Sequence, residues 1–404
     1  MNKKFLITHT MLKKAAGGPV RRFLVCALYE DGKMAEVSLQ PAGTESILHN
    51  MYTARVQNVA AGLHAAFVEI SAGQRCFLPL DDSKHPIFVK KTSQKPIAAG
   101  DELVVQICKE AYHTKEAVAT TNLSFSGEYL ILTSANRKIG VSSKLPSIQK
   151  KRLQALAEKL RGNDTHYGLI LRTNAAAADE ERIQAEFLRL KSEYERLAAY
   201  AATRTAGSCL RREQPLYRRM LMDTDKAGLT EIITDEQAVY DDLRQDPLTD
   251  AAVRLYADNL LPLASLYSVS SQLEDACKPR VWLKSGANII IQPTEALTVI
   301  DVNSSKHVVK KEKQPYHYQI NREAAAEIAR QLRLRNISGI IIVDFIDLYD
   351  DEQNASLLKE FRSQLKKDPV PVQLMGMTRL GLVELTRKKL KKPLLEQLTS
   401  AFCT

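Results

Sequence analysis

The sequence predicts a multidomain α+β protein, and three observations lead to this fold class. The chain has 404 residues, more than the roughly 250–300 that a single hydrophobic core usually serves. Short strand-like segments punctuated by glycine fill residues 45–120, which is typical of a small β-barrel. From residue 281 onward apolar strands alternate with helices, which is the pattern of an α/β domain.

The composition is that of an ordinary globular protein with a basic balance. Hydrophobic residues make up 45% and charged residues 26%, which excludes disordered and collagen-like classes. The formal net charge of +10 favours a polyanionic partner, because Lys and Arg attract phosphate backbones. No apolar run approaches the ~20 residues of a membrane span, and the N-terminal run is too short and broken for a signal peptide. We therefore expect a cytoplasmic protein with no membrane contact.

Six cysteines are scattered along the chain without a CxxC pair. The sequence thus shows neither a zinc ribbon nor a disulfide framework. Reduced thiols are the expectation, and zinc is not expected as a cofactor.

Residues 1–40 have the pattern of short strands. The segment "RRFLVCALYEDGKMAEVSLQ" predicts a hairpin whose turn is Asp31-Gly32, a dipeptide typical of hairpin turns. This piece is too small to fold alone, so we expect it to pair with a later segment. Residues 215–280 are expected to be mostly helical, for example in "DAAVRLYADNLLPLASLY".

Two aromatic residues distinguish the expected barrel. In "AAFVEI", the alternation of side chains puts Phe67 on the face of Glu69, opposite Val68. Phe67 is therefore expected on the solvent side, and Phe77 in "RCFLPL" can join it from an adjacent strand. Exposed aromatics on a small β-barrel stack on unpaired bases, and ordinary core packing is the alternative.

Residues 121–214 mix strands with helices. "PSIQKKRLQALAEKLRG" predicts a helix ended by Gly162, and "DEERIQAEFLRLKSEYERLAAYAA" predicts a second helix with one apolar stripe. "GLILRT" places Arg172 and Thr173 at the end of a strand. A guanidinium beside a hydroxyl is a good phosphate receptor, and a solvated strand end is the alternative.

Two later apolar strands each contain an aspartate near their end. In "LTVIDVN", Asp301 and Asn303 share one face, and Asp344 comes late in "IIIVDFIDL". If these strands are neighbours, the two carboxylates converge, and they repel each other unless a cation or proton intervenes. Mg²⁺ prefers such oxygen ligands and can activate water against a phosphodiester, while Asn303 can hold the water or a phosphate oxygen. The alternative is that both aspartates are ordinary strand-end residues, as we interpret Asp347, a turn or helix-cap residue.

The helix between these strands, "NREAAAEIARQLRLR", has an apolar face and Asn321 as its expected N-cap. Its arginines, Arg330, Arg333 and Arg335, are expected to be solvated. Phosphate contact is the alternative for them.

These motifs resemble the ribonuclease E/G family of bacterial endoribonucleases. The resemblance is carried by "TEALTVIDVNSS", "NREAAAEIARQLRLRNISGIIIVDFIDL" and "MTRLGLVELTRKKL", in that order, and it extends over essentially the whole chain. It implies that Asp301 and Asp344 bind one catalytic Mg²⁺ and that Asn303 helps to orient the attack. In the last motif Arg379 and Arg387 are weaker candidates for phosphate contact, with salt bridging as the alternative.

The same resemblance implies two further sites. The barrel is similar to the family's OB-fold RNA-binding domain of the ribosomal S-one type, in which Phe67, Phe77 and Lys115 match residues that contact RNA. The segment after it resembles a sensor domain that holds a 5′-monophosphate. Its matching residues are Gly127, Ile131, Arg172 and Thr173.

Two departures from the family pattern accompany the resemblance. Ser143 stands where the family usually has a basic residue, and the adjacent Lys144 is expected to point elsewhere, which puts the strength of 5′-end sensing in doubt. The paired cysteines of the family's zinc link are missing, since "SAFCT" offers only Cys403. A homodimer stays open, but a zinc-linked one is not expected.

The resemblance implies an architecture and an activity. The architecture is an RNase H-like domain split between residues 1–40 and 215–280, an OB-fold at 41–121, a sensor domain at 122–214 and a DNase I-like α/β catalytic domain at 281–404. The activity is Mg²⁺-dependent hydrolysis of single-stranded RNA, in rRNA and tRNA maturation and mRNA decay. The alternatives are a non-catalytic RNA-binding protein and a metal-dependent phosphoesterase acting on DNA or small phosphates.

Overall fold

The computed structural model divides the chain into two compact units. Unit 1 combines Met1–Thr44 with Leu216–Thr404, and unit 2 is Glu45–Pro215. The segments whose structure is described are residues 2–13, 19–43, 46–81, 85–111, 115–258, 260–304 and 313–400. Within these segments, no helix combines the length and the apolar character needed to cross a membrane.

The first sheet of unit 1 begins with the hairpin expected from the sequence. The turn residues Asp31 and Gly32 have φ of 47° and 82°, the left-handed backbone that a tight hairpin turn needs. The prediction is therefore confirmed. The strand order is β16-β15-β1-β2-β3, with the bounds β1 (Lys3–Lys13), β2 (Val20–Glu30), β3 (Lys33–Pro41), β15 (Leu229–Thr234) and β16 (Ala252–Leu255).

The pairing of β1 with β15 joins the start of the chain to a segment more than 200 residues later. The two strands are parallel, with Phe5 opposite Ile232, so the expectation that the first strands need a later partner is confirmed. The expectation of mostly helical structure in 215–280 is wrong where β15 and β16 lie. Both strands are short, and short apolar runs do not distinguish a strand from a helix by their periodicity.

Helices cover both faces of this sheet. On one face, Phe5 and Ile7 pack with α3 and α4, and on the other Leu6 packs with α5, α6 and the start of α9. The result is a three-layer arrangement, which follows from the alternation of side chains along β1. The helices are α3 (Leu216–Asp223), α4 (Gln237–Gln245), α5 (Leu263–Leu266), α6 (Val269–Cys277) and α9 (Leu394–Ser400).

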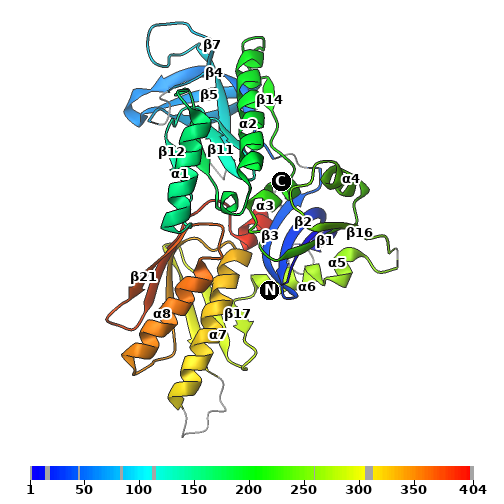
Figure 1. Cartoon of the computed structure of the whole chain (residues 1–404), viewed down its shortest axis with the longest axis vertical. Helices are drawn as coiled ribbons and strands as arrows, with labels where there is room; N and C mark the ends of the chain where they lie inside the picture. The colour runs from blue at the N-terminus through cyan, green and yellow to red at the C-terminus, as the bar shows by residue number, and fades with distance from the viewer. Residues whose placement is uncertain are drawn as a thin grey trace. The chain divides into compact units, whose positions relative to one another are not determined.

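The second sheet of unit 1 has helices on one face. Ile300 and Val343 pack against Ala325 and Phe361 in its core, and Figure 1 shows α7 and α8 side by side over this sheet. The opposite face carries the less buried side chains. The order is β17-β18-β19-β20-β22-β21, with β17 (Arg280–Trp282), β18 (Asn288–Pro293), β19 (Leu297–Asn303), α7 (Lys313–Leu334), β20 (Gly339–Asp344), α8 (Asp351–Leu365), β21 (Val372–Met377) and β22 (Val383–Arg387).

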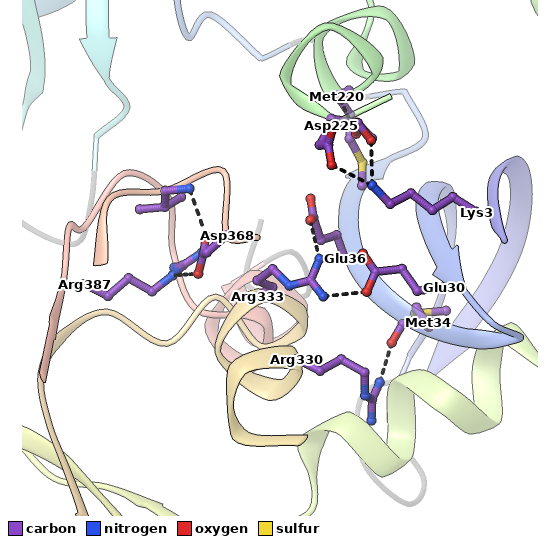
Figure 2. A network of polar contacts seen from close by, with 12 residues as sticks. Lys3, Glu30, Met34, Glu36, Met220, Asp225, Arg330, Arg333, Asp368 and Arg387 are labelled. Carbon is purple, nitrogen blue, oxygen red and sulfur yellow. Dashed lines mark hydrogen bonds and ion pairs between the residues drawn. The ribbon is translucent and has the colours of Figure 1, made fainter. Parts of the chain in front are cut away.

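Arg330, Arg333 and Arg335, at the end of α7 and just after it, are partly or fully buried and bonded to acceptors. Figure 2 shows Arg333 between Glu30 and Glu36, at 2.7 and 3.0 Å, and Arg330 donating to the carbonyl of Met34. Arg335 is also buried. The expectation that these side chains are solvated is wrong, because α7 lies against β3, and a buried guanidinium needs acceptors.

Unit 2 contains a closed five-stranded barrel. Its strands run in the cycle β4-β5-β6-β9-β8, closed by the pairing of β4 with β8, which is consistent with an OB-like fold. The short strands β7 and β14 extend it. The bounds are β4 (Met51–Ala60), β5 (Ala65–Ser71), β6 (Gln74–Pro79), β7 (Phe88–Lys90), β8 (Glu102–Lys109), β9 (Ala117–Thr120) and β14 (Cys209–Arg211), with the 3₁₀ turn η1 (Ala61–Leu63).

The rest of unit 2 is a four-stranded sheet packed against two helices. The helix expected to stop at Gly162 does so, and the apolar stripe expected for the next helix is buried at Ile183, Phe187 and Leu190. Both helix predictions are confirmed. The sheet order is β10-β11-β13-β12, with β10 (Ser124–Ser126), β11 (Leu130–Thr133), β12 (Ile139–Val141), α1 (Ser147–Arg161), β13 (Gly168–Leu171), η2 (Thr173–Ala176) and α2 (Glu180–Ala201).

Candidate active site

Asp301 and Asp344 are paired residues on neighbouring parallel strands. β19 and β20 align so that Asp301 lies opposite Asp344, and neighbouring strands are about 4.7–4.9 Å apart. The condition set by the sequence, that the two strands be adjacent, is therefore met. α7 is the connection that lets the two strands run parallel.

The burial pattern places this pair on the face of the sheet away from the helices. Along β19, Ile300 and Val302 are buried, while Asp301 and Asn303 are only partly so. Along β20, Val343 is buried and Asp344 is exposed. The carboxylates thus occupy the open face, where a phosphodiester could approach them.

Electrostatics within the pair resemble those of a cation site. Partial burial, followed by the carboxylates of Asp301 and Asp347, raises the pKa of Asp344 above its ordinary value of 3.8. A divalent cation would relieve this repulsion. Asn303 donates from Nδ2 to Oδ2 of Asp301 at 2.8 Å, which fixes one carboxylate oxygen. Two carboxylates with a neighbouring amide match the ligands of Mg²⁺.

The described segments show no cluster of three or more His, Cys, Asp or Glu side chains fit for a metal.

Asp347 lies exposed in the connection after β20, and its charge acts on Asp344. Of the two roles expected for Asp347, turn residue or helix cap, the role of helix cap is wrong. The cap of α8 is Asp350, which accepts from the amide of Glu352 at 2.9 Å.

Asn321 holds the segment that follows Asp344. It is fully buried inside α7 rather than at the start of that helix, so its expected role as N-cap is wrong. Its side chain donates to the carbonyl of Ile346 at 2.7 Å and accepts from the amide of Ile346 at 3.0 Å. The sequence offered one signal, a polar residue on the apolar face of a helix.

The two arginines of the last motif lie in different surroundings. Arg387 is 3% exposed and pairs with Asp368 at 2.7 Å, as Figure 2 shows. It also donates to Asn336 and to the carbonyl of Ile337. This geometry favours the salt-bridge interpretation over phosphate contact. Arg379, in contrast, is exposed in the turn between β21 and β22, at the end of the sheet where β20 finishes.

In the barrel, Phe67 and Phe77 are cross-strand partners. Their rings meet edge to face at 5.8 Å, and both are partly exposed while Val68 is buried. The expected solvent-side placement is confirmed. The guanidinium of Arg75 lies 4.9 Å from the Phe67 ring centre, a contact that sequence analysis missed. Lys115 is exposed just before β9.

Gly127 begins a turn whose backbone amides hold a carboxylate. Glu186 of α2 accepts from the amides of Glu128, Tyr129 and Leu130 at 2.5, 2.7 and 3.0 Å. A Cβ at Gly127 would lie 2.3 to 2.6 Å from this carboxyl group, so a larger residue there would displace the Glu186 side chain. Sequence analysis missed Glu186, because nothing in a helix pattern indicates acceptance from a distant turn.

The structure brings Arg172 and Gly127 together. Arg172 donates from Nη1 to the carbonyl of Gly127 at 2.8 Å, and Thr173 follows at the start of η2 with its hydroxyl 2.9 Å from that of Ser142. The side chain that contacts Thr173 is thus Ser142. It is the neighbour of Ser143, the residue that departs from the family pattern. Ile131, on β11, pairs with Ile170 of β13, within the same small sheet.

The aromatic pair of the barrel and the aspartate pair of the sheet indicate a class of protein. A barrel with an exposed aromatic pair is typical of single-stranded nucleic-acid binding, and two converging carboxylates are typical of a cation-dependent phosphodiesterase. Together the two features are those of a protein that acts on nucleic acid. The chain belongs to the ribonuclease E/G family, whose model matches residues 124–390.

Curated relatives support this membership along most of the chain. Ribonuclease G of Haemophilus influenzae is 32% identical over 385 residues, covering 91% of this chain and 78% of the relative. Ribonuclease E of Nostoc sp. is 32% identical over 377 residues, covering 90% of this chain and 54% of the relative. Ribonuclease E of Escherichia coli is 30% identical over 382 residues, covering 91% of this chain and 36% of the relative.

Proposed function

We propose that this protein is a Mg²⁺-dependent endoribonuclease that hydrolyses single-stranded RNA and leaves 5′-phosphate and 3′-hydroxyl ends. Membership of the ribonuclease E/G family identifies it as an endoribonuclease, a hydrolase acting on RNA. The observation that supports the cation and its location is the register of Asp301 with Asp344 on the open face of the sheet. Maturation of rRNA and tRNA and decay of mRNA in the cytoplasm are the proposed settings.

In this proposal each residue of the candidate active site has a defined role. Asp301 and Asp344 hold the cation, which when bound polarises the phosphodiester and activates water. Asn303 keeps Asp301 oriented through its 2.8 Å hydrogen bond, and its amide oxygen can accept from the attacking water. Arg379, exposed at the same end of the sheet, contacts a neighbouring phosphate. Arg387 is omitted from this set because its guanidinium is buried against Asp368.

The barrel holds the RNA in single-stranded form. Phe67 and Phe77 offer ring surfaces to unpaired bases, each worth about 1–3 kcal/mol. Lys115 adds positive charge along the phosphate backbone, while Arg75 lies beside the Phe67 ring and is paired with Glu116 at 2.6 Å. This surface requires no particular base, because every base has a stacking face.

We further propose that the 5′-monophosphate binds at Arg172 and Thr173, with Gly127 and Ile131 shaping the site. The support is local: the Arg172 guanidinium, the Thr173 hydroxyl and the carbonyl of Gly127 lie within one small sheet and its adjoining turn. Ser142 is bonded to Thr173, and neither it nor the adjacent Ser143, which stands where the family usually has a basic residue, carries a charge. We therefore expect the preference for 5′-monophosphorylated RNA to be modest.

The division into five parts is also a proposal. It assigns an RNase H-like domain to 1–40 and 215–280, an OB-fold to 41–121, a sensor to 122–214 and a DNase I-like domain to 281–404. The two-unit division of the chain is compatible with it, since residues 1–44 join residues from 216 onward and the barrel lies in the other unit.

Cleavage of a short single-stranded RNA, with Mg²⁺ and then with EDTA, tests the activity. Asp301→Asn and Asp344→Asn should each abolish cutting while RNA binding, measured by anisotropy, stays within about twofold. Asp351→Asn is the matched control, because Asp351 is an exposed aspartate in the first turn of α8. Its cutting rate should equal that of the unaltered chain.

The substrates should include 5′-monophosphate and 5′-hydroxyl RNA and a DNA of equal sequence. Binding without cutting under every condition would leave only an RNA-binding protein. Equal cutting of DNA and RNA would indicate a general phosphoesterase. Undiminished cutting by both aspartate variants would reject the proposed cation site.

A further inference from the structure

We propose that Arg280 and Trp282 form a stacking subsite for an unpaired nucleobase on the open face of the catalytic sheet. The base would belong to a nucleotide next to the one whose phosphate reaches Asp301 and Asp344. This inference rests on the proposed function, because it assumes that RNA lies across this face. It adds a binding surface formed by an edge strand, outside the barrel and the 5′-phosphate site.

The register of the sheet places the pair in line with the catalytic residues. Arg280 pairs with Ile290, which pairs with Asp301, so one row crosses three strands to the carboxylates. The next row runs from Trp282 through Asn288 to Asn303. Two strand spacings of about 4.8 Å separate the ends of each row, which is within the reach of an adjacent nucleotide.

The burial of β17 shows which face these side chains occupy. Val281, between them, packs against the core beneath the helices, while Arg280 and Trp282 are exposed. Because successive side chains of a strand alternate, both lie on the face that carries Asp301. The Arg280 guanidinium is 5.6 Å from the Trp282 ring centre, which places the two side chains together.

Trp282 is 64% exposed, although an indole gains much from burial. β17 is an edge strand of the described sheet. No further strand of the described sheet blocks the approach of a planar ring. An exposed indole with a guanidinium beside it is a suitable surface for a base, since both stack on π systems and the cation attracts the adjoining phosphate.

The chain contains a single tryptophan, so its intrinsic fluorescence reports on this site directly. In the Asp301→Asn background, which keeps RNA intact, a 5′-hydroxyl single-stranded RNA should change the emission on binding. An abasic strand of the same length should bind with little change in emission. An equal change with the abasic strand would mean that the backbone, rather than a base, lies there and would overturn the proposal.

Variants with intact catalytic residues give a second measurement. Trp282→Ala should lower kcat/KM for single-stranded RNA by about 5- to 150-fold, the loss of one stacked base. Trp282→Phe should retain most of the activity, because it keeps a ring. Met375→Ala is the control, since Met375 is equally exposed, at 65%, on β21 of the same sheet.

The outcomes separate this subsite from the activity itself. Normal cutting by Trp282→Ala, together with unchanged emission on RNA binding, would reject the stacking subsite and leave the nuclease proposal intact. Absence of cutting by the unaltered chain would reject the nuclease proposal instead. A loss in Trp282→Ala that Phe does not restore would indicate a structural role and would also contradict stacking.

Discussion

The carboxylate of Glu186 occupies the space that a side chain at Gly127 would need. Gly127→Ala would therefore push the carboxylate off the three amides that donate to it. Buried amides without an acceptor cost about 1–3 kcal/mol, so the turn should open more easily. Hydrogen exchange of residues 128–130 should quicken by about 5- to 150-fold, and the cutting preference for 5′-monophosphate RNA should fall.

Gly140→Ala is the control for this change. A Cβ at Gly140, in β12 of the same small sheet, would meet Ile170 at an ordinary 3.8 Å. Its exchange rates and substrate preference should stay as they are. Unchanged exchange in Gly127→Ala would mean that Glu186 does not hold the turn.

Asn303 should mainly affect the Mg²⁺ concentration at which cutting is half-maximal. Asn303→Ala removes the hydrogen bond that fixes Oδ2 of Asp301. Outer groups that orient metal ligands typically contribute 10- to 100-fold in metal affinity or activity, so the half-saturating Mg²⁺ concentration should rise by about that factor. Titrations of the cutting rate with Mg²⁺ would measure it. Gln292→Ala, an exposed amide on β18, should leave the titration unchanged.

Asn321 should stabilise the segment that carries Asp344 and Asp347. Asn321→Ala leaves the amide and carbonyl of Ile346 without their partners, at a cost of about 1–3 kcal/mol. Hydrogen exchange after β20 should quicken, and cutting should slow. Asn354→Ala, which removes one bond to the carbonyl of Leu348, should have a smaller effect. An equal effect of both variants would contradict a special role for Asn321.

The sequence was sufficient to predict features that depend on neighbours along the chain. The turn at Asp31-Gly32 follows from local backbone preference, and the faces of Asp301 and Phe67 follow from strand alternation. The missed features depend on partners far away. Glu186 binds amides 56 to 58 residues earlier, and Arg333 pairs with Glu30 across 303 residues. No local pattern reveals such partners, since they are brought together only by packing.

The aromatic pair of the barrel should contribute to RNA binding as a unit. Phe67→Ala should weaken binding by about 5- to 150-fold, the loss of one stacked base. Phe77→Ala should act similarly, and the double variant should lose less than the sum, because the two rings contact each other at 5.8 Å. Anisotropy of labelled RNA in the Asp301→Asn background measures this. Full additivity would show that the rings act independently.

Arg333 should stabilise unit 1 in a way that depends on pH. Arg333→Met removes the partner of Glu30 and Glu36, and an uncompensated buried charge costs about 3–5 kcal/mol. Burial raises the pKa of Glu36 above its ordinary 4.5, while Arg333 lowers it, so the variant should raise it further. Because the pKa of Glu36 is higher in the folded protein than its ordinary 4.5, protonation of Glu36 contributes stability that is fully present below pH 4.5. This stability is lost as the pH rises through the folded-state pKa of Glu36.

The variant should therefore lose more stability at pH 8 than at pH 5, as urea unfolding at both values would show. Adding Glu36→Gln to Arg333→Met removes one of the two carboxylate charges that lost their partner. The double variant should therefore regain part of the stability at pH 8 and show a weaker pH dependence. Glu36→Gln alone is the necessary comparison, because it leaves Arg333 its contact with Glu30 at 2.7 Å. Equal losses at the two pH values would show that Glu36 does not take up a proton when Arg333 is absent.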